Sequence, residues 1–86
     1  IPLCHPVLIE HVNVNLEIDE KNNSIHITAE CKVFGKTGIE MEALTAVSAT
    51  ALTIYDMCKS IDRSIEINKI YLIHKSGGKS GTYNAK

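Results

Sequence analysis

Two runs of alternating apolar and polar residues, separated by a short polar segment, constrain the fold of this chain most strongly. Apolar side chains occupy every second position from Val12 to Ile18, and the pattern returns from Ile25 to Val33. A period of two is typical of a strand with one buried face. The polar segment 19–24 suits a turn, so the sequence predicts an antiparallel hairpin.

A helical pattern follows the second run, from about Ile39 to Ile61. The apolar residues that recur at steps of three and four are Leu44, Val47, Ala51, Ile54, Tyr55, Cys58 and Ile61. This spacing places them on one face of a helix. Small residues on the other sides allow close approach of more than one neighbour, including another subunit. A last strand is expected at about Ile65 to Ile73.

The predicted order of strand, strand, helix, strand is typical of an α+β fold in which a helix packs on an antiparallel sheet. We expect residues 1–86 to form a single domain. A chain of 86 residues buries only about 60–65% of its unfolded surface, so it is marginally stable alone. It begins at Ile1 without an initiator Met, and we therefore expect it to be the C-terminal part of something longer.

Charge and composition limit the partners. The formal net charge is −1, which provides no overall field for nucleic acid or an anionic membrane. No stretch approaches the ~20 apolar residues of a membrane span. The three cysteines form no C-x-x-C pair, which favours a reducing compartment, the cytoplasm, over a disulfide framework. Cysteines and histidines show no metal-ligand spacing, so we expect no metal site.

The segment His74 to Gly81, HKSGGKSG, combines two lysines with three glycines. Its backbone amides, with Lys75 and Lys79, could form a nest for a phosphate, or the segment could be a solvated tail. A phosphate-binding P-loop is excluded, because Ile73 stands where its first glycine is required and too few residues follow for a helix. Both remaining interpretations stay open.

Asp56 and Lys59 are three residues apart in the predicted helix and therefore share a face. Such a pair is usually a surface ion pair that stabilises a helix by about 0.2–0.5 kcal/mol. In a desolvated cleft, Asp56 could instead exchange protons while Lys59 stabilises negative charge. Helical spacing alone favours the surface pair.

Two carboxylates, Glu40 and Glu42, flank Met41 at the expected helix start, where they complement the helix dipole. Glu42 and Asp56 are fourteen residues apart, which corresponds to about 21 Å along a straight helix. One small-molecule site would not use both from the same chain. If both are functional, the site is shared between subunits.

Near the N-terminus, Leu3, Cys4 and His5 lie between two prolines in an extended segment. Adjacent side chains of an extended chain point in opposite directions, so Cys4 and His5 are a poor catalytic dyad. His5 alone could act as a general acid or base, or as a phosphate donor.

Four stretches carry a family resemblance. In chain order they are PLCHP, GKTGIEMEALTA, ALTIYDMCK and KSGGKSG. Together they closely resemble the C-terminal part of the molybdenum cofactor biosynthesis protein C family, cyclic pyranopterin monophosphate synthase. The resemblance implies conversion of 3′,8-cyclo-7,8-dihydro-GTP to cyclic pyranopterin monophosphate with release of pyrophosphate and without a cofactor. It also implies a ferredoxin-like fold and a hexamer, a trimer of dimers, with active sites at subunit interfaces.

The resemblance also assigns roles to residues of this chain. It implies Asp56 as the catalytic residue with Lys59 as its partner. The residues implied to contact substrate are Leu3, Cys4, His5, Met41, Glu42, Lys75 and Lys79.

The family protein is nearly twice this length, and its N-terminal half carries a basic loop that faces the site. That half is expected to be cleaved, disordered or supplied by a separate chain, or else activity is compromised, and the sequence leaves these alternatives open. The alternative function is a non-catalytic module that binds nucleotide phosphates or another protein. Asp56 favours the enzyme, since a carboxylate near phosphates lowers the affinity of a simple binder.

Overall fold

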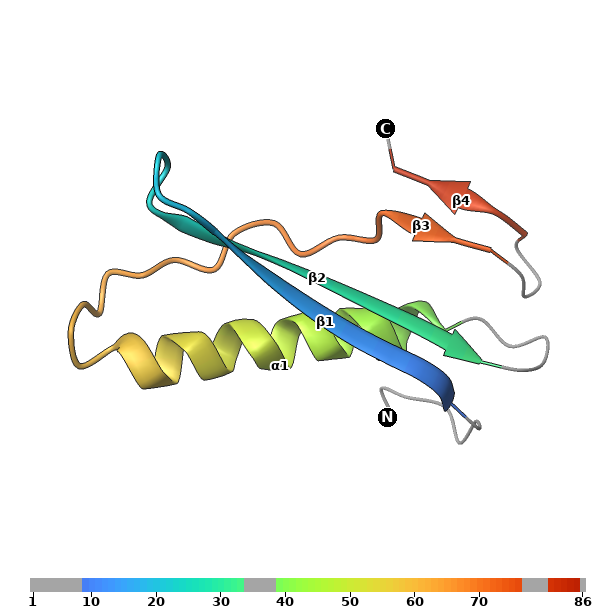
Figure 1. The fold of residues 1–86 in the computed structure, drawn as a ribbon, viewed down its shortest axis with the longest axis horizontal. Coiled ribbons are helices and arrows are strands. Elements are labelled where there is room, and N and C mark those ends of the chain that lie inside the picture. Colours follow the sequence, from blue (N-terminus) through green and yellow to red (C-terminus); the bar gives the residue numbers. More distant parts are fainter. Residues whose placement is uncertain (1–8, 34–38, 77–80, 86) are drawn as a thin grey trace.

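The computed structural model describes residues 9–33, 39–76 and 81–85. In chain order its elements are β1 (Ile9–Asp19), β2 (Ser24–Val33), α1 (Glu40–Cys58), β3 (His74–Lys75) and β4 (Tyr83–Asn84). In the described part of the chain, β1 pairs with β2 and β3 pairs with β4, forming two separate two-stranded sheets. The helix lies across the long hairpin, and the short sheet lies near the C-terminus (Figure 1). The α+β class is confirmed.

The predicted hairpin is confirmed, with strands slightly longer than the alternating runs. Its antiparallel register pairs Leu16 with Ile27 and Val14 with Ala29, so apolar side chains of both strands share one face. The turn is fixed by Asp19, whose carboxylate accepts hydrogen bonds from the backbone N–H and the side-chain amide of Asn22 at 3.1 and 2.9 Å. Asn23 closes the turn at φ 49°, a left-handed conformation that asparagine tolerates.

Helix α1 is also confirmed, and it packs against β2. The hydroxyls of Ser48, Thr50 and Thr53 each donate to the carbonyl four residues earlier, at 2.7, 2.8 and 2.7 Å, so these polar groups find partners within the helix. The helix ends at Cys58, earlier than Ile61. The carbonyl of Cys58 accepts hydrogen bonds from the N–H groups of Ile61 and Asp62, at 2.9 and 3.2 Å, which closes a turn there.

The strand expected at 65–73 is wrong. This segment is fully described and forms no strand; the nearest strand is β3, which begins at His74. A strand requires a neighbouring backbone, and a groove separates this segment from β2. Lys69 also adopts φ 36°, which interrupts the extended conformation. The second strand of the short sheet, β4, was not predicted.

The described chain leaves its apolar surfaces open. Among its described residues no hydrophobic side chain is buried, and the one buried residue is Glu42, 5% exposed. Leu16 and Ile18 on β1 are 50% and 74% exposed although they lie on the apolar face of the hairpin. Helix α1 packs against β2, and the apolar side chains of β1 stay exposed to solvent. The sequence-based expectation of marginal stability agrees with this burial.

Candidate functional site

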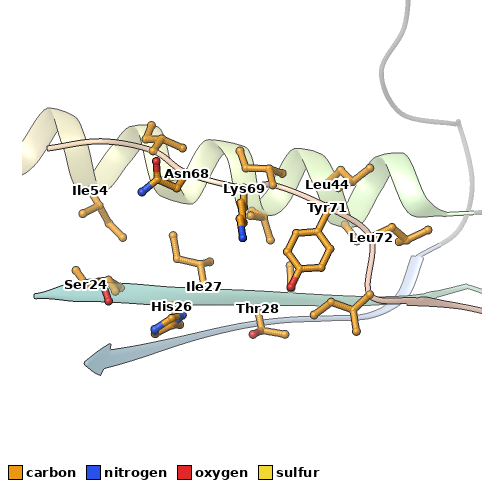
Figure 2. Close-up of a pocket in the computed structure, with 18 of the residues that line it drawn as sticks. Ser24, His26, Ile27, Thr28, Leu44, Ile54, Asn68, Lys69, Tyr71 and Leu72 are labelled. Carbon is orange, nitrogen blue, oxygen red and sulfur yellow. The ribbon is translucent and has the colours of Figure 1, made fainter. Parts of the chain in front are cut away.

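An open groove of about 1510 Å³ runs between β2, α1 and the segment from Asp62 to Ser76. Figure 2 shows Ile54 of α1 and Ile27 of β2 pointing into the space between the two elements. It also shows Tyr71, from the segment 62–76, pointing toward β2. The walls are therefore largely apolar. Two of its charged lining residues are Glu40, the first residue of α1, and Lys75, near the end of the segment 62–76.

Lys75 contacts the start of α1. Its Nζ lies 3.2 Å from Oε2 of Glu40, and the two side chains are 12% and 37% exposed. Strand β3 holds Lys75 opposite Tyr83 of β4. The short sheet therefore carries the ammonium to the helix N-terminus, where the Glu40 carboxylate offsets both its charge and the helix dipole.

The glycine-rich segment is anchored on both sides. Before it, His74 Nδ1 lies 2.6 Å from Asn84 Oδ1, and the N–H of Ala85 donates to the carbonyl of Ile73 at 2.6 Å. At its end, Gly81 adopts φ +72°, a left-handed conformation that glycine adopts freely. The described residues on both sides of 77–80 are therefore held by the pairing of β3 with β4. Lys79 lies outside the described residues, so the phosphate nest stays a prediction.

Asp56 and Lys59 form a surface ion pair. The ammonium of Lys59 donates a hydrogen bond of 2.7 Å to Oδ1 of Asp56, and the side chains are 49% and 71% exposed, respectively. Neither residue lines the groove. The predicted surface pair is confirmed, and the described residues leave it open to solvent.

The other residues implied to bind substrate are only partly described. Glu42 is buried in the first turn of α1, and the neighbouring Met41 is 37% exposed. Leu3, Cys4 and His5 lie outside the described residues. The structure therefore brings Lys75 to the helix start near Met41 and Glu42, while Asp56 and Lys59 lie more than three turns away along α1.

Sequence reasoning missed Glu40 as a partner of Lys75 and assigned it only to the helix dipole. The two residues are far apart in sequence, and no motif spacing relates them. Opposite charge was the only sequence signal for this ion pair, and many other combinations of an acidic and a basic residue in the chain have it too.

Within residues 9–33, 39–76 and 81–85, no three His, Cys, Asp or Glu side chains gather as ligands of a metal ion would. No helix in the described part of the chain has the length and hydropathy needed to cross a membrane.

These features define an α+β protein with two carboxylate–lysine pairs and an anchored lysine- and glycine-rich loop, a set of groups suited to an anionic ligand. Residues 1–78 match the MoaC family, and the chain belongs to that family.

Three relatives carry the name cyclic pyranopterin monophosphate synthase. The Clostridium acetobutylicum protein is 60% identical over 83 residues, which cover 96% of this chain and 52% of the relative. The Roseiflexus castenholzii protein is 57% identical over 81 residues, covering 94% and 51%. The Clostridium perfringens protein is 57% identical over 84 residues, covering 98% and 53%. The chain thus spans about half the length of the curated relatives it matches.

Proposed function

We propose that this chain provides part of a cyclic pyranopterin monophosphate synthase, in which residues 1–86 are the C-terminal part of the synthase domain. The observation that carries the proposal is the identity of 57–60% to relatives with that name across nearly the whole chain. The proposed substrate is 3′,8-cyclo-7,8-dihydro-GTP. The products are cyclic pyranopterin monophosphate and pyrophosphate.

The reaction explains the residue types. The imidazole ring of the purine must open, protons must move among nitrogen and oxygen atoms, and an internal hydroxyl must bond to the α-phosphorus as the bond to pyrophosphate breaks. Asp56 with Lys59 suits the proton transfers. Lys75 and Lys79 suit the triphosphate, because an ammonium neutralises charge as it moves onto the leaving pyrophosphate. Leu3, Cys4, His5, Met41 and Glu42 would contact the remainder of the substrate. The rearrangement requires no redox cofactor.

The site is proposed to be shared between subunits of a homo-oligomer, a hexamer built as a trimer of dimers. Fourteen residues of helix place Glu42 and Asp56 about 21 Å apart along the axis, too far for one small molecule. The side chain of Asp56 is also 71% exposed, so the described residues do not remove it from water. A neighbouring subunit would supply the second surface that desolvates the pair. A separate N-terminal chain is the other candidate for that surface.

The finer fold is proposed to be ferredoxin-like, with a further strand between β2 and the segment 65–76. All residues from 24 to 32 line the groove on one side and those from 64 to 76 on the other. Successive side chains of an extended segment point to opposite faces, so a groove lined by side chains alone would be lined by every second residue. Because the lining residues are consecutive, the backbone edges of both segments face the groove. A strand in the groove would satisfy both edges. It would also explain why the segment 65–73 has strand-like composition without strand pairing.

We also propose a cytoplasmic location and no nucleic-acid or membrane partner. The three cysteines of the sequence form no C-x-x-C pair, a pattern that favours a reducing compartment over a disulfide framework. The competing function, a non-catalytic module that binds nucleotide phosphates, shares the lysines but gives no role to Asp56.

The test is to incubate purified protein with 3′,8-cyclo-7,8-dihydro-GTP and measure pyrophosphate and the pterin product together, while native mass spectrometry reports the assembly. We expect both products in equal amounts from a multimeric species. Substrate binding without either product would support the non-catalytic module instead. A parallel incubation with GTP is the control, because the synthase should leave it unchanged.

A further inference from the structure

Glu40 is a charged residue that lines the groove, and the proposed function gives it no role. It is the first residue of α1, and its Oε2 lies 3.2 Å from Nζ of Lys75. Both side chains line the same end of the groove. The relationship between these two residues therefore bears on how Lys75 is presented to a ligand.

Lys75 needs a carboxylate partner in this position. Its side chain is only 12% exposed, compared with 49% for Lys59. An ammonium removed from water is costly unless it is paired. The N-terminal end of a helix adds a repulsive partial positive charge. Among the described residues, Glu40 is the only ion-pair partner of Lys75, and its negative charge offsets both costs.

The contact leaves the donors of Lys75 available. Oε2 of Glu40 is buried and accepts no hydrogen bond within the described residues, although it lies within ion-pair distance of Nζ. In contrast, Lys59 donates a hydrogen bond of 2.7 Å to Asp56. Glu40 thus fixes the position of the Lys75 ammonium through charge, and because an ammonium has three N–H donors, a single carboxylate contact leaves donors for oxygen atoms of a ligand.

We propose that Glu40 is a positioning residue that holds the Lys75 ammonium at the end of the groove in the orientation that binds the triphosphate. This inference rests on the proposed function. Glu40 acts through Lys75 and bonds to no reacting atom. The opposite possibility is that Glu40 competes with phosphate for Lys75, and the two roles predict opposite changes in affinity.

The experiment compares Glu40→Gln, which keeps the shape and removes the charge, with Glu40→Asp, which keeps the charge. Glu17→Gln is the matched control, because Glu17 is an exposed glutamate of β1 that does not line the groove. We expect Glu40→Gln to raise KM about five- to tenfold and to change kcat less than about twofold, as for loss of one partly buried charge contact. Glu40→Asp should recover part of the loss. An unchanged or lower KM for Glu40→Gln would overturn the inference.

A second readout does not depend on turnover. NMR relaxation of the lysine side chains should show Lys75 as more ordered than the exposed Lys32 in the wild-type protein. In Glu40→Gln, the order of Lys75 should fall to the level of Lys32. If wild-type protein forms no product, the proposed function fails, and the Lys75 measurement still decides the positioning role. Unchanged order of Lys75 in Glu40→Gln would refute that role.

Discussion

The ammonium of Lys59 donates a 2.7 Å hydrogen bond to the carboxylate of Asp56 on an exposed face of α1, outside the groove that Lys75 enters. The two groups proposed for proton transfer are therefore already paired, but in water. An exposed pair contributes little to stability, about 0–1 kcal/mol. In the described chain water therefore surrounds the pair, and the proposed shared site is what would desolvate it.

Asp56→Asn should abolish turnover and leave the fold intact. The substitution removes a proton acceptor but preserves the size of the side chain. Because Asp56 is 71% exposed, we expect the free energy of unfolding to change by less than about 1 kcal/mol. Pyrophosphate release measures the first effect and thermal unfolding by circular dichroism measures the second. Turnover at the wild-type rate would remove Asp56 from the mechanism.

Lys75→Ala should weaken triphosphate binding about tenfold, as expected for loss of one charge-assisted contact. Titration calorimetry with inorganic triphosphate measures this change directly. Lys21→Ala, in the exposed turn of the hairpin, is the control and should bind like the wild type. Equal affinity of both variants would assign the glycine-rich loop a purely structural role.

Gly81→Ala should loosen the short sheet. A Cβ atom at Gly81 meets no atom within 4 Å, so the cost is conformational and arises from φ +72°. That cost is about 1 kcal/mol for a residue with a side chain. Hydrogen exchange at the N–H of Ala85, which donates to Ile73, should become faster. Gly81→Asn should exchange more slowly than Gly81→Ala, because asparagine tolerates this conformation; the reverse order would contradict the account.

The hairpin turn should weaken in acid. The Asn22 side-chain amide and backbone N–H donate to the Asp19 carboxylate and lower its pKa from the ordinary 3.8. A lowered pKa in the folded state means that the stabilising effect is complete above about pH 3.8. It is lost as the pH falls through the lower folded value. NMR titration of the Asp19 carboxyl carbon, with hydrogen exchange in the hairpin, measures both changes.

Asp19→Asn is the control for this effect: the hairpin protection factors, which are corrected for the intrinsic pH dependence of exchange, should no longer fall as the pH passes through the Asp19 pKa. An Asp19 pKa at or above 3.8 in the folded protein would show that the hydrogen bonds from Asn22 do not stabilise the carboxylate in solution.

Local patterns predicted the hairpin and the helix because each depends on neighbours in the sequence. Alternation determined which side chains of β1 and β2 share a face, and the register agrees. The helix start was also accurate, at Glu40. Its end was placed too late: the helix ends at Cys58, whose carbonyl accepts hydrogen bonds from the N–H groups of Ile61 and Asp62 in the turn that follows.

Features that depend on distant partners were not predictable in this way. The segment 65–73 has the composition of a strand, but among the described residues only its last member, Ile73, pairs with another backbone, through the N–H of Ala85. The contact between Lys75 and Glu40 arises only from tertiary structure. Family resemblance, in contrast, selected candidate residues without indicating which of them would meet in one chain. Of these, Leu3, Cys4, His5 and Lys79 remain predictions outside the described residues.

The central claim is that Asp56 of one subunit and Lys75 of another serve the same synthase site. The most direct measurement mixes Asp56→Asn with Lys75→Ala, after dissociation and reassembly, and records pyrophosphate release from 3′,8-cyclo-7,8-dihydro-GTP. Each variant alone should have little activity. The mixture should recover a substantial fraction of the wild-type rate, because some interfaces then combine an intact Asp56 with an intact Lys75. A mixture no more active than the separate variants would contradict the shared site.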